Sequence, residues 1–201
     1  MKRFVDVIFS FFAMCVLLPF SLLILLFIAI ESRGPLLSRP HRVGRNGRMV
    51  KVYEFRSAIS DPDALETLGG CHGEQVTRVG ALLRRLRVTR WPMLINVLKG
   101  DLSLVGPRAE MPRYVGCYPT EVRKQVLSIK PGLVDLASIE FTGERSLLAG
   151  LEGEELEEAY MDKVLPVRLE YARKYLERRG FWLDARIILL ALLRGILPRK
   201  S

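Results

Sequence analysis

Residues 7–30 form an unbroken apolar run without a charged side chain. As an α-helix, these 24 residues would extend about 36 Å, more than the roughly 30 Å hydrocarbon core of a bilayer. Such a run predicts a helix in contact with lipid, and a transmembrane span is its simplest form. A cleaved signal peptide fits less well, because the run is long for such a segment and no small-residue cleavage site follows it.

Pro19 lies at the centre of this run and suggests another path through the membrane. Proline removes a backbone donor and clashes with the preceding turn, and each half of a helix broken there is too short to span. Lys2 and Arg3 precede the run, and six further cations lie between residues 33 and 51. Because cationic flanks prefer the cytoplasm, a re-entrant helix with its hinge at Pro19 competes with a kinked span. Both paths leave the remainder of the chain in the cytoplasm.

The composition of the chain limits the kinds of protein that it can be. A hydrophobic content of 49% excludes disorder as the main state, and a net charge of +9 predicts an anionic partner. The three cysteines, Cys15, Cys71 and Cys117, are an odd number without a C-x-x-C pair, and only His41 and His72 are histidines. A disulfide framework, a zinc ribbon and a histidine metal site are therefore not expected.

The pattern of the chain predicts an α-rich α/β fold in two parts. A re-entrant membrane helix is expected at residues 1–31, and a small cytosolic domain with amphipathic interfacial helices at 32–201. The alternating residues 50–55 predict a strand, and turns are expected at 61–63 and 68–70. Helices are expected at 79–98 with an interruption at Pro92, at 120–127 with Thr120 as N-cap, at 154–179, and at 182–197.

Short motifs follow one another along nearly the whole chain. They are Lys2-Arg3 with Asp6, residues 32–35 (SRGP), 42–47 (RVGRNG), 53–57 (YEFRS), 77–80 (TRVG), 92–108 (PMLINVLKGDLSLVGPR), 130–133 (KPGL) and 182–184 (WLD). Their order resembles the bacterial sugar transferase family, the monotopic polyprenyl-phosphate phosphoglycosyl transferases. The run at 92–108 is the most specific match.

The resemblance implies a chemistry. Family members move a sugar 1-phosphate from a UDP-sugar to a polyprenyl phosphate in the cytoplasmic leaflet, and UMP leaves. An adjacent Asp-Glu pair carries the reaction: the Asp attacks the β-phosphorus to give a phosphosugar-enzyme intermediate, while Mg²⁺ neutralises the diphosphate.

This chain departs from the family at that pair. The motifs on both sides fix the register, so that Thr89 occupies the Asp position and Arg90 the Glu position. Thr89 has no carboxylate, and Arg90 cannot accept its proton near pH 7. Arg90 also brings a permanent cation to the place of Mg²⁺, so no metal site is expected. Trp91 stands where Leu is usual.

A second exchange has the opposite sign. Glu54 replaces the lysine of the family's Y-K-F-R-S motif. We hypothesise that Glu54 and Arg90 form an ion pair that fills the former metal site, with a separation of less than about 6 Å. The alternative is two independent, solvated surface charges.

Four other residues are candidates for a role at the site. The resemblance makes Arg108 and Arg56 phosphate-binding residues, against the alternative of ordinary surface arginines. Asp101 and Glu110 are the remaining acids near the motif and candidate substitute nucleophiles. The basic helix at residues 84–90 lacks an accompanying RNA-binding aromatic motif, so we expect no nucleic-acid partner.

The sequence thus predicts a catalytically degenerate family member on the cytoplasmic face of a bacterial inner membrane. It would support polysaccharide or glycoconjugate assembly as a homo-oligomer or through an active homologue, in contact with membrane lipid and able to bind UDP-sugar or polyprenyl phosphate. No cofactor is expected. The main alternative is an active, Mg²⁺-dependent transferase with a substitute nucleophile at Thr89, Asp101 or Glu110. A membrane-surface binding module unrelated to sugars is a third.

Overall fold

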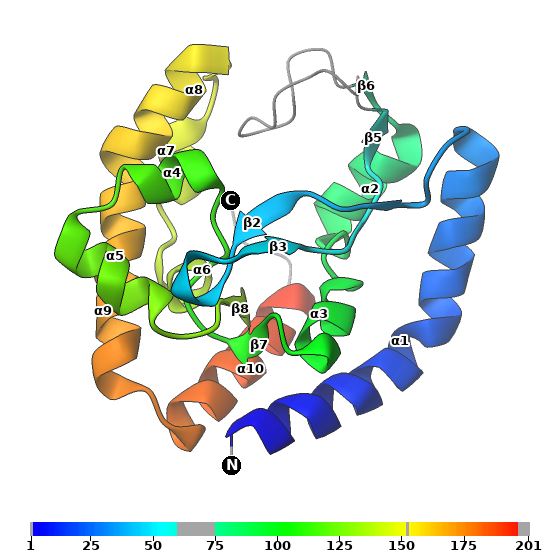
Figure 1. Cartoon of the computed structure of the whole chain (residues 1–201). Coiled ribbons are helices and arrows are strands. Elements are labelled where there is room, and N and C mark those ends of the chain that lie inside the picture. The colour runs from blue at the N-terminus through cyan, green and yellow to red at the C-terminus, as the bar shows by residue number, and fades with distance from the viewer. Residues whose placement is uncertain (1, 60–74, 152, 197–201) are drawn as a thin grey trace.

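The computed structural model describes residues 2–59, 75–151 and 153–196 (Figure 1). The turns expected at 61–63 and 68–70, with Cys71 and His72, lie outside the described residues. Helices dominate the described chain and the strands pair only in twos, which confirms the α-rich prediction.

The first part of the chain carries one long helix and most of the strands. The elements are α1 (Lys2–Glu31), β1 (Leu37–Ser38), β2 (His41–Val43), the short 3₁₀ turn η1 (Arg45–Gly47), β3 (Met49–Lys51), β4 (Glu54–Phe55), β5 (Ala58–Ile59) and β6 (Gln75–Val76). The pairs β1–β4, β2–β3 and β5–β6 are antiparallel. Asn46 adopts a positive φ of 57° at the tip of the β2–β3 hairpin, as its turn sequence predicts.

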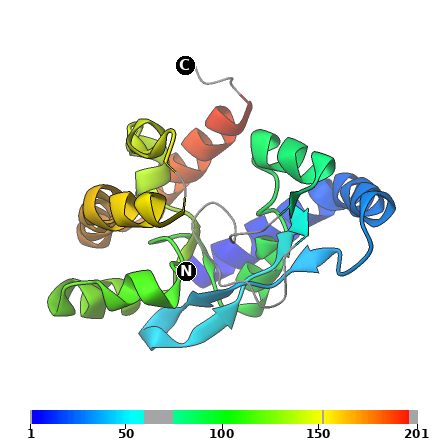
Figure 2. The ribbon, with the colours of Figure 1, turned by 90° about the horizontal axis from the view of Figure 1, so that it is seen from above.

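The second part is mostly helical. Its elements are α2 (Arg78–Leu86), α3 (Met93–Lys99), β7 (Ser103–Val105), α4 (Pro112–Gly116), α5 (Thr120–Leu127), β8 (Gly132–Val134), α6 (Leu136–Glu140), α7 (Glu144–Leu148), α8 (Gly153–Ala159), the π-helical turn η2 (Tyr160–Val164), α9 (Leu165–Arg178) and α10 (Phe181–Ile196). The β7–β8 pair is parallel. Helices α4, α5, α8 and α9 gather on one side and α1 and α2 on the other, in both views (Figures 1 and 2).

Helix α1 has the length and hydropathy to cross a membrane, and large apolar side chains along it are exposed. It is continuous through Pro19 and bends near its middle (Figure 1). The expected break is therefore a bend, because a proline removes only one hydrogen bond while the flanking turns remain helical.

The N-terminal end of α1 is fastened to the globular part. Lys2 lies 2.9 Å from the Asp184 carboxylate and donates to the Tyr175 hydroxyl at 2.6 Å. Arg3 donates to the carbonyls of Val97 and Leu98 at the end of α3. These contacts hold α1 against α3 and α10. They give a structural reason for the Lys2-Arg3 motif and for Asp184 in the motif at residues 182–184.

The C-terminal end of α1 is fastened to the same body. The Glu31 carboxylate accepts hydrogen bonds from the first two backbone amides of α2, Arg78 at 2.6 Å and Val79 at 2.9 Å. The buried Arg56 donates to the carbonyls of Ser32 at 2.7 Å and Arg33 at 3.1 Å. Both ends of a 30-residue helix thus contact one folded unit.

The core lies between α3, β7 and α10, around Val97, Leu102 and Ile187. Asn96 is fully buried beside it and satisfies its side-chain amide completely. It accepts from the Tyr53 amide at 2.9 Å and donates to the Lys51 carbonyl at 2.8 Å. Because a buried polar group without partners is unfavourable, this amide pins the link between β3 and β4 to α3.

Two of the predicted helices are interrupted in the structure in ways that the prediction did not include. The helix expected at 79–98 ends at Leu86, because Arg87 adopts a left-handed conformation with φ 59° and caps it. Pro92 precedes α3 as its N-cap, so the expected interruption covers the whole turn 87–92. The helix expected at 154–179 is divided into α8, the π-turn η2 and α9. Pro166, in the first turn of α9, lacks the amide that would continue the α-helical pattern from η2.

Two further predictions need correction. The N-cap of α5 is Pro119 and not Thr120, because the Pro119 carbonyl accepts the first helical hydrogen bond, from Arg123 at 2.9 Å. The strand expected at 50–55 is split between β3 and β4, since Pro40 has no amide with which to extend the β2–β3 pairing and the Tyr53 amide donates to the Asn96 side chain. The helix expected at 182–197 is present as α10.

Candidate functional site

The turn at residues 87–92 carries the two positions that replace the family's acidic pair. Val88 and Trp91 pack against the apolar cluster of Ile28, Phe55 and Leu83, which fixes one side of the turn. The Thr89 carbonyl accepts a hydrogen bond from the Phe55 amide at 2.9 Å. That bond brings β4, and with it Glu54, beside Arg90.

Glu54 and Arg90 are in ion-pair contact. The Nε of Arg90 lies 3.9 Å from the Oε1 of Glu54, within the 6 Å that the hypothesis requires. Their side chains are 24% and 42% exposed, so water screens the attraction. The contact is longer than a charge-assisted hydrogen bond. That this pair stands in a former metal site stays a prediction.

Arg108 follows β7 in a tightly packed loop. Gly106 and Gly132 approach so closely that a Cβ on Gly132 would overlap the Gly106 backbone. This approach aligns Arg108 beside Gly132 in an isolated parallel bridge. The Nε of Arg108 lies 3.5 Å from the carboxylate of Glu110, which also accepts the Tyr160 hydroxyl at 2.8 Å.

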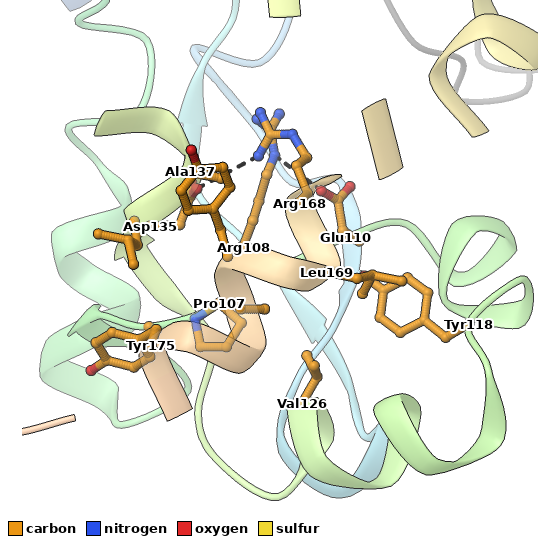
Figure 3. A pocket seen from close by; sticks show the side chains of 14 residues that line it. Pro107, Arg108, Glu110, Tyr118, Val126, Asp135, Ala137, Arg168, Leu169 and Tyr175 are labelled. Carbon is orange, nitrogen blue, oxygen red and sulfur yellow. Dashed lines mark ion pairs between the residues drawn. The ribbon is translucent and has the colours of Figure 1, made fainter. Parts of the chain in front are cut away.

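Arg168 reaches the same place from α9, and no motif in the sequence points to it. Its side chain is 6% exposed and lies against Asp135 at 3.6 Å and Glu144 at 2.6 Å. Figure 3 shows the guanidinium groups of Arg108 and Arg168 side by side between the carboxylates of Asp135 and Glu110. The cavity that they line is small, about 20 Å³, room for about one water molecule.

Repulsion between guanidinium groups and burial lower the pKa values of these arginines, and nearby carboxylates raise them. The Arg108 guanidinium lowers the pKa of Arg90 to about 10, partial burial adds to the effect, and Glu54 opposes it. Burial also lowers the pKa of Arg168, but Asp135, Tyr160 and Glu110 outweigh burial and raise it. All three arginines are cationic at neutral pH.

The other candidate residues lie in different surroundings. Arg56 contacts the end of α1, where its Nη atoms donate to Ser32 and Arg33, and its role in phosphate binding stays a prediction. Asp101 accepts a hydrogen bond from the Asn96 side chain at 3.3 Å. Glu110 is buried and engaged by Arg108 and Tyr160. Asp101 is thus hydrogen-bonded through one oxygen, and the Oε1 of Glu110 is held from two sides; a role of either acid as substitute nucleophile stays a prediction.

The donors around Arg90 do not fit Mg²⁺. This ion prefers several carboxylate or water oxygens in an octahedron, and here each nearby carboxylate already faces a guanidinium. Within residues 2–59, 75–151 and 153–196, no group of three or more His, Cys, Asp and Glu side chains could hold a metal ion. No reaction step through a metal is therefore derived from this site.

Comparison with known protein sequences agrees with the motifs. Residues 1–197 match the family described as bacterial sugar transferase. The chain belongs to this family. It is 32% identical over 207 residues to an undecaprenyl-phosphate glucose phosphotransferase of Komagataeibacter xylinus, covering all of this chain and 36% of that protein.

Two more relatives are similar. A UDP-glucose:undecaprenyl-phosphate glucose-1-phosphate transferase of Escherichia coli (strain K12) is 30% identical over 205 residues, which cover all of this chain and 41% of the relative. An exopolysaccharide production protein of Rhizobium leguminosarum bv. phaseoli is 41% identical over 110 residues, 54% of this chain and 55% of that protein. The chain thus spans well under half the length of the two glucose phosphotransferase relatives.

A double-mutant cycle of Glu54→Gln and Arg90→Gln tests the ion pair. The two side chains are partly exposed, so we expect a coupling free energy of about 0.5–1 kcal/mol in the unfolding of the purified chain. The exposed pair of Glu121 and Lys124 is the control and should show a coupling near zero. Equal coupling in both cycles would mean that Glu54 and Arg90 are independent surface charges.

Proposed function

We propose that this bacterial sugar transferase family member does not catalyse sugar-phosphate transfer and instead supports glycan assembly on the membrane through a partner. One observation carries the proposal: the position of the family's nucleophile holds Thr89, and the neighbouring Arg90 is in contact with Glu54. The hydroxyl of Thr89 lacks a free base that would remove its proton, because its neighbour is a guanidinium and the nearby Glu54 carboxylate faces that guanidinium. The similarity to two undecaprenyl-phosphate glucose phosphotransferases and to an exopolysaccharide production protein supports a role in polysaccharide assembly.

The ligands that the relatives' names contain are proposed for this chain too. Arg108 keeps its place in the loop after β7, beside Arg168, and a guanidinium pair suits a phosphate group. We therefore infer that the chain binds a UDP-sugar or a polyprenyl phosphate without turning it over. Catalysis by Asp101 or Glu110 has less support, because the side chains that hold these acids would have to release them first.

A membrane path with re-entry is part of the proposal. If α1 crossed the bilayer, Lys2 and Glu31 would lie on opposite sides, yet both contact the same folded body. The bend near the middle of α1 supports the same path. Exposed apolar side chains on α10, among them Trp182 and Leu189, suit an interfacial position on the cytoplasmic face of the inner membrane.

Transfer activity is the direct test of catalysis. We expect the purified chain to leave a radiolabelled sugar phosphate on the UDP-sugar when undecaprenyl phosphate and Mg²⁺ are supplied. The double variant Thr89→Asp/Arg90→Glu should gain Mg²⁺-dependent transfer, since it restores the acidic pair between motifs that are otherwise retained apart from Glu54 and Trp91. Transfer by the unmodified chain that Asp101→Asn or Glu110→Gln abolishes would establish the substitute-nucleophile mechanism instead.

Protease protection of an N-terminal epitope tests the re-entrant path. In right-side-out vesicles the epitope of the unmodified chain should resist external protease, because Lys2 stays on the inner side with Asp184. Pro19→Ala favours a straight helix, so part of the population should expose the epitope. Leu18→Ala is the control and should remain protected. Digestion of the unmodified chain would establish a transmembrane span.

Capture from native membranes tests the partner. Mild crosslinking followed by affinity purification of the full chain should recover an active member of the same family, or a second copy of this chain. A catalytically silent protein that acts alone would be recovered alone, and this outcome would contradict the partner role.

A further inference from the structure

Two cations from distant parts of the chain meet at the C-terminal end of α3. Gly100 ends this helix with a positive φ of 94°. From the position that a Cβ of this glycine would take, the Arg3 guanidinium is 3.1 Å away and the Lys130 ammonium 3.4 Å. Arg3 comes from the start of α1, and Lys130 lies just before β8. Because like charges repel, this approach favours an anion in the space beside Gly100.

Two further cations lie on one aromatic ring at the same end of α3. The Lys99 ammonium donates to the Tyr53 hydroxyl at 2.7 Å and lies 4.6 Å from the centre of its ring. The Arg39 guanidinium lies 5.3 Å from the centre of the same ring. Such contacts hold a cation in place without neutralising its charge. Since Lys99 directly precedes Gly100, the two pairs form one group, which we call the α3 cation group: Arg3, Arg39, Lys99 and Lys130.

The protein compensates the α3 cation group only in part. The C-terminal end of a helix carries about half a negative charge, and Arg3 alone offsets it by donating to the carbonyls of Val97 and Leu98. In residues 2–59, 75–151 and 153–196, no carboxylate forms an ion pair with a member of the group. Asp101 is the acid next to the group in the sequence, and it accepts from the Asn96 side chain. A single carboxylate leaves the group with an excess of positive charge.

The α3 cation group lies where the apolar surface of α1 begins. Exposed large side chains start directly after Arg3, with Phe4 at 70% exposure, and continue along α1 with Val5, Ile8 and Phe9. In a bilayer these side chains would be immersed in hydrocarbon, so the group would stand at the level of the phospholipid headgroups. Anionic headgroups attract Lys and Arg side chains over about a Debye length, roughly 8–10 Å.

A lipid fits these observations better than an anion in solution. A nucleic acid or a free phosphate ester would engage the cations but would leave Phe4 and Val5 in water. A phospholipid covers apolar side chains with its acyl chains, while its phosphate stays within reach of the neighbouring cations. A headgroup without an amine keeps the net negative charge that would compensate the group.

We propose that the α3 cation group binds the headgroup of an anionic phospholipid beside the start of α1. Phosphodiester oxygens accept from Arg3 and Lys130, and Lys99 and Arg39 attract the remaining negative charge. The inference rests on the proposed re-entrant path, which brings Arg3 to the cytoplasmic leaflet, and it adds a lipid class and the residues that select it. None of these residues lines the cavity of Arg108 and Arg168.

Native mass spectrometry of the full chain in detergent tests the inference. The chain is given equal amounts of phosphatidylglycerol, which is anionic, and phosphatidylcholine, which is zwitterionic, with the same acyl chains. The unmodified chain should bind phosphatidylglycerol at least about tenfold better. Lys99→Gln and Lys130→Gln should each lower this preference about fivefold, because each removes a cation that attracts an anionic headgroup.

Three control variants separate the position of a charge from its removal. Lys99→Arg and Lys130→Arg keep the positive charge and should keep the preference. Arg173→Gln removes an exposed cation from α9 and should leave the preference unchanged. Lys99 is exposed, so Lys99→Gln is informative even if Lys130→Gln unfolds the chain.

Each adverse outcome has a distinct meaning. Equal binding of the two lipids, or a preference that neither lysine-to-glutamine variant lowers, would overturn the lipid site. Displacement of phosphatidylglycerol by an excess of glycerol 3-phosphate or of a short RNA would identify a soluble anion as the ligand and overturn the assignment to lipid.

The proposed function and the lipid site fail separately. The lipid measurement requires no UDP-sugar, partner or transfer, so its failure would leave the proposed catalytic silence standing. It also reads the site without a bilayer. A confirmed preference together with protease digestion of the N-terminal epitope would overturn the re-entrant path and still support the binding residues.

Discussion

A guanidinium buried between helices is the constraint on which the site depends. Arg168 lies against Asp135 at the start of α6 and Glu144 at the start of α7, and it thereby joins three helices. A buried charge that lost one partner would leave the other uncompensated, at a cost of about 3–5 kcal/mol. Such a cluster contributes little net stability, but it fixes where each of its members lies. Arg108 and Glu110 take their positions beside it.

The membrane segment, the helix-rich class and the charge exchange at the site could be predicted from the sequence. The membrane segment at 7–30 can be predicted because hydropathy is a local property of the sequence. Helices α5 and α10 can be predicted from local patterns as well. The contact of Glu54 with Arg90 was predictable because two motifs of known order had exchanged charges. Each of these inferences uses only residues that are neighbours in the sequence or that belong to a recognised motif.

The remaining features depend on contacts that no local pattern encodes. Arg87 ends α2 in a left-handed conformation, and the basic, helix-forming sequence around it does not predict this end. Arg168 is one of several cations on α9, and only packing against α6 and α7 distinguishes it from the exposed Arg173. Asp135 caps α6 through the Ser138 amide and pairs with Arg168, and no local pattern indicates the second contact. Long-range charge pairing of this kind is set by the tertiary fold.

The attachment of α1 at both ends has a mechanical consequence. Lys2 and Arg3 hold one end to α10 and α3, and Glu31 holds the other to α2, so α1 cannot shift relative to the globular part without breaking these contacts. If α1 is immersed in lipid, the contacts set the height and tilt of the guanidinium groups of Arg108 and Arg168 relative to the leaflet. Under the proposed function, the phosphate of a polyprenyl phosphate would meet those groups at one depth.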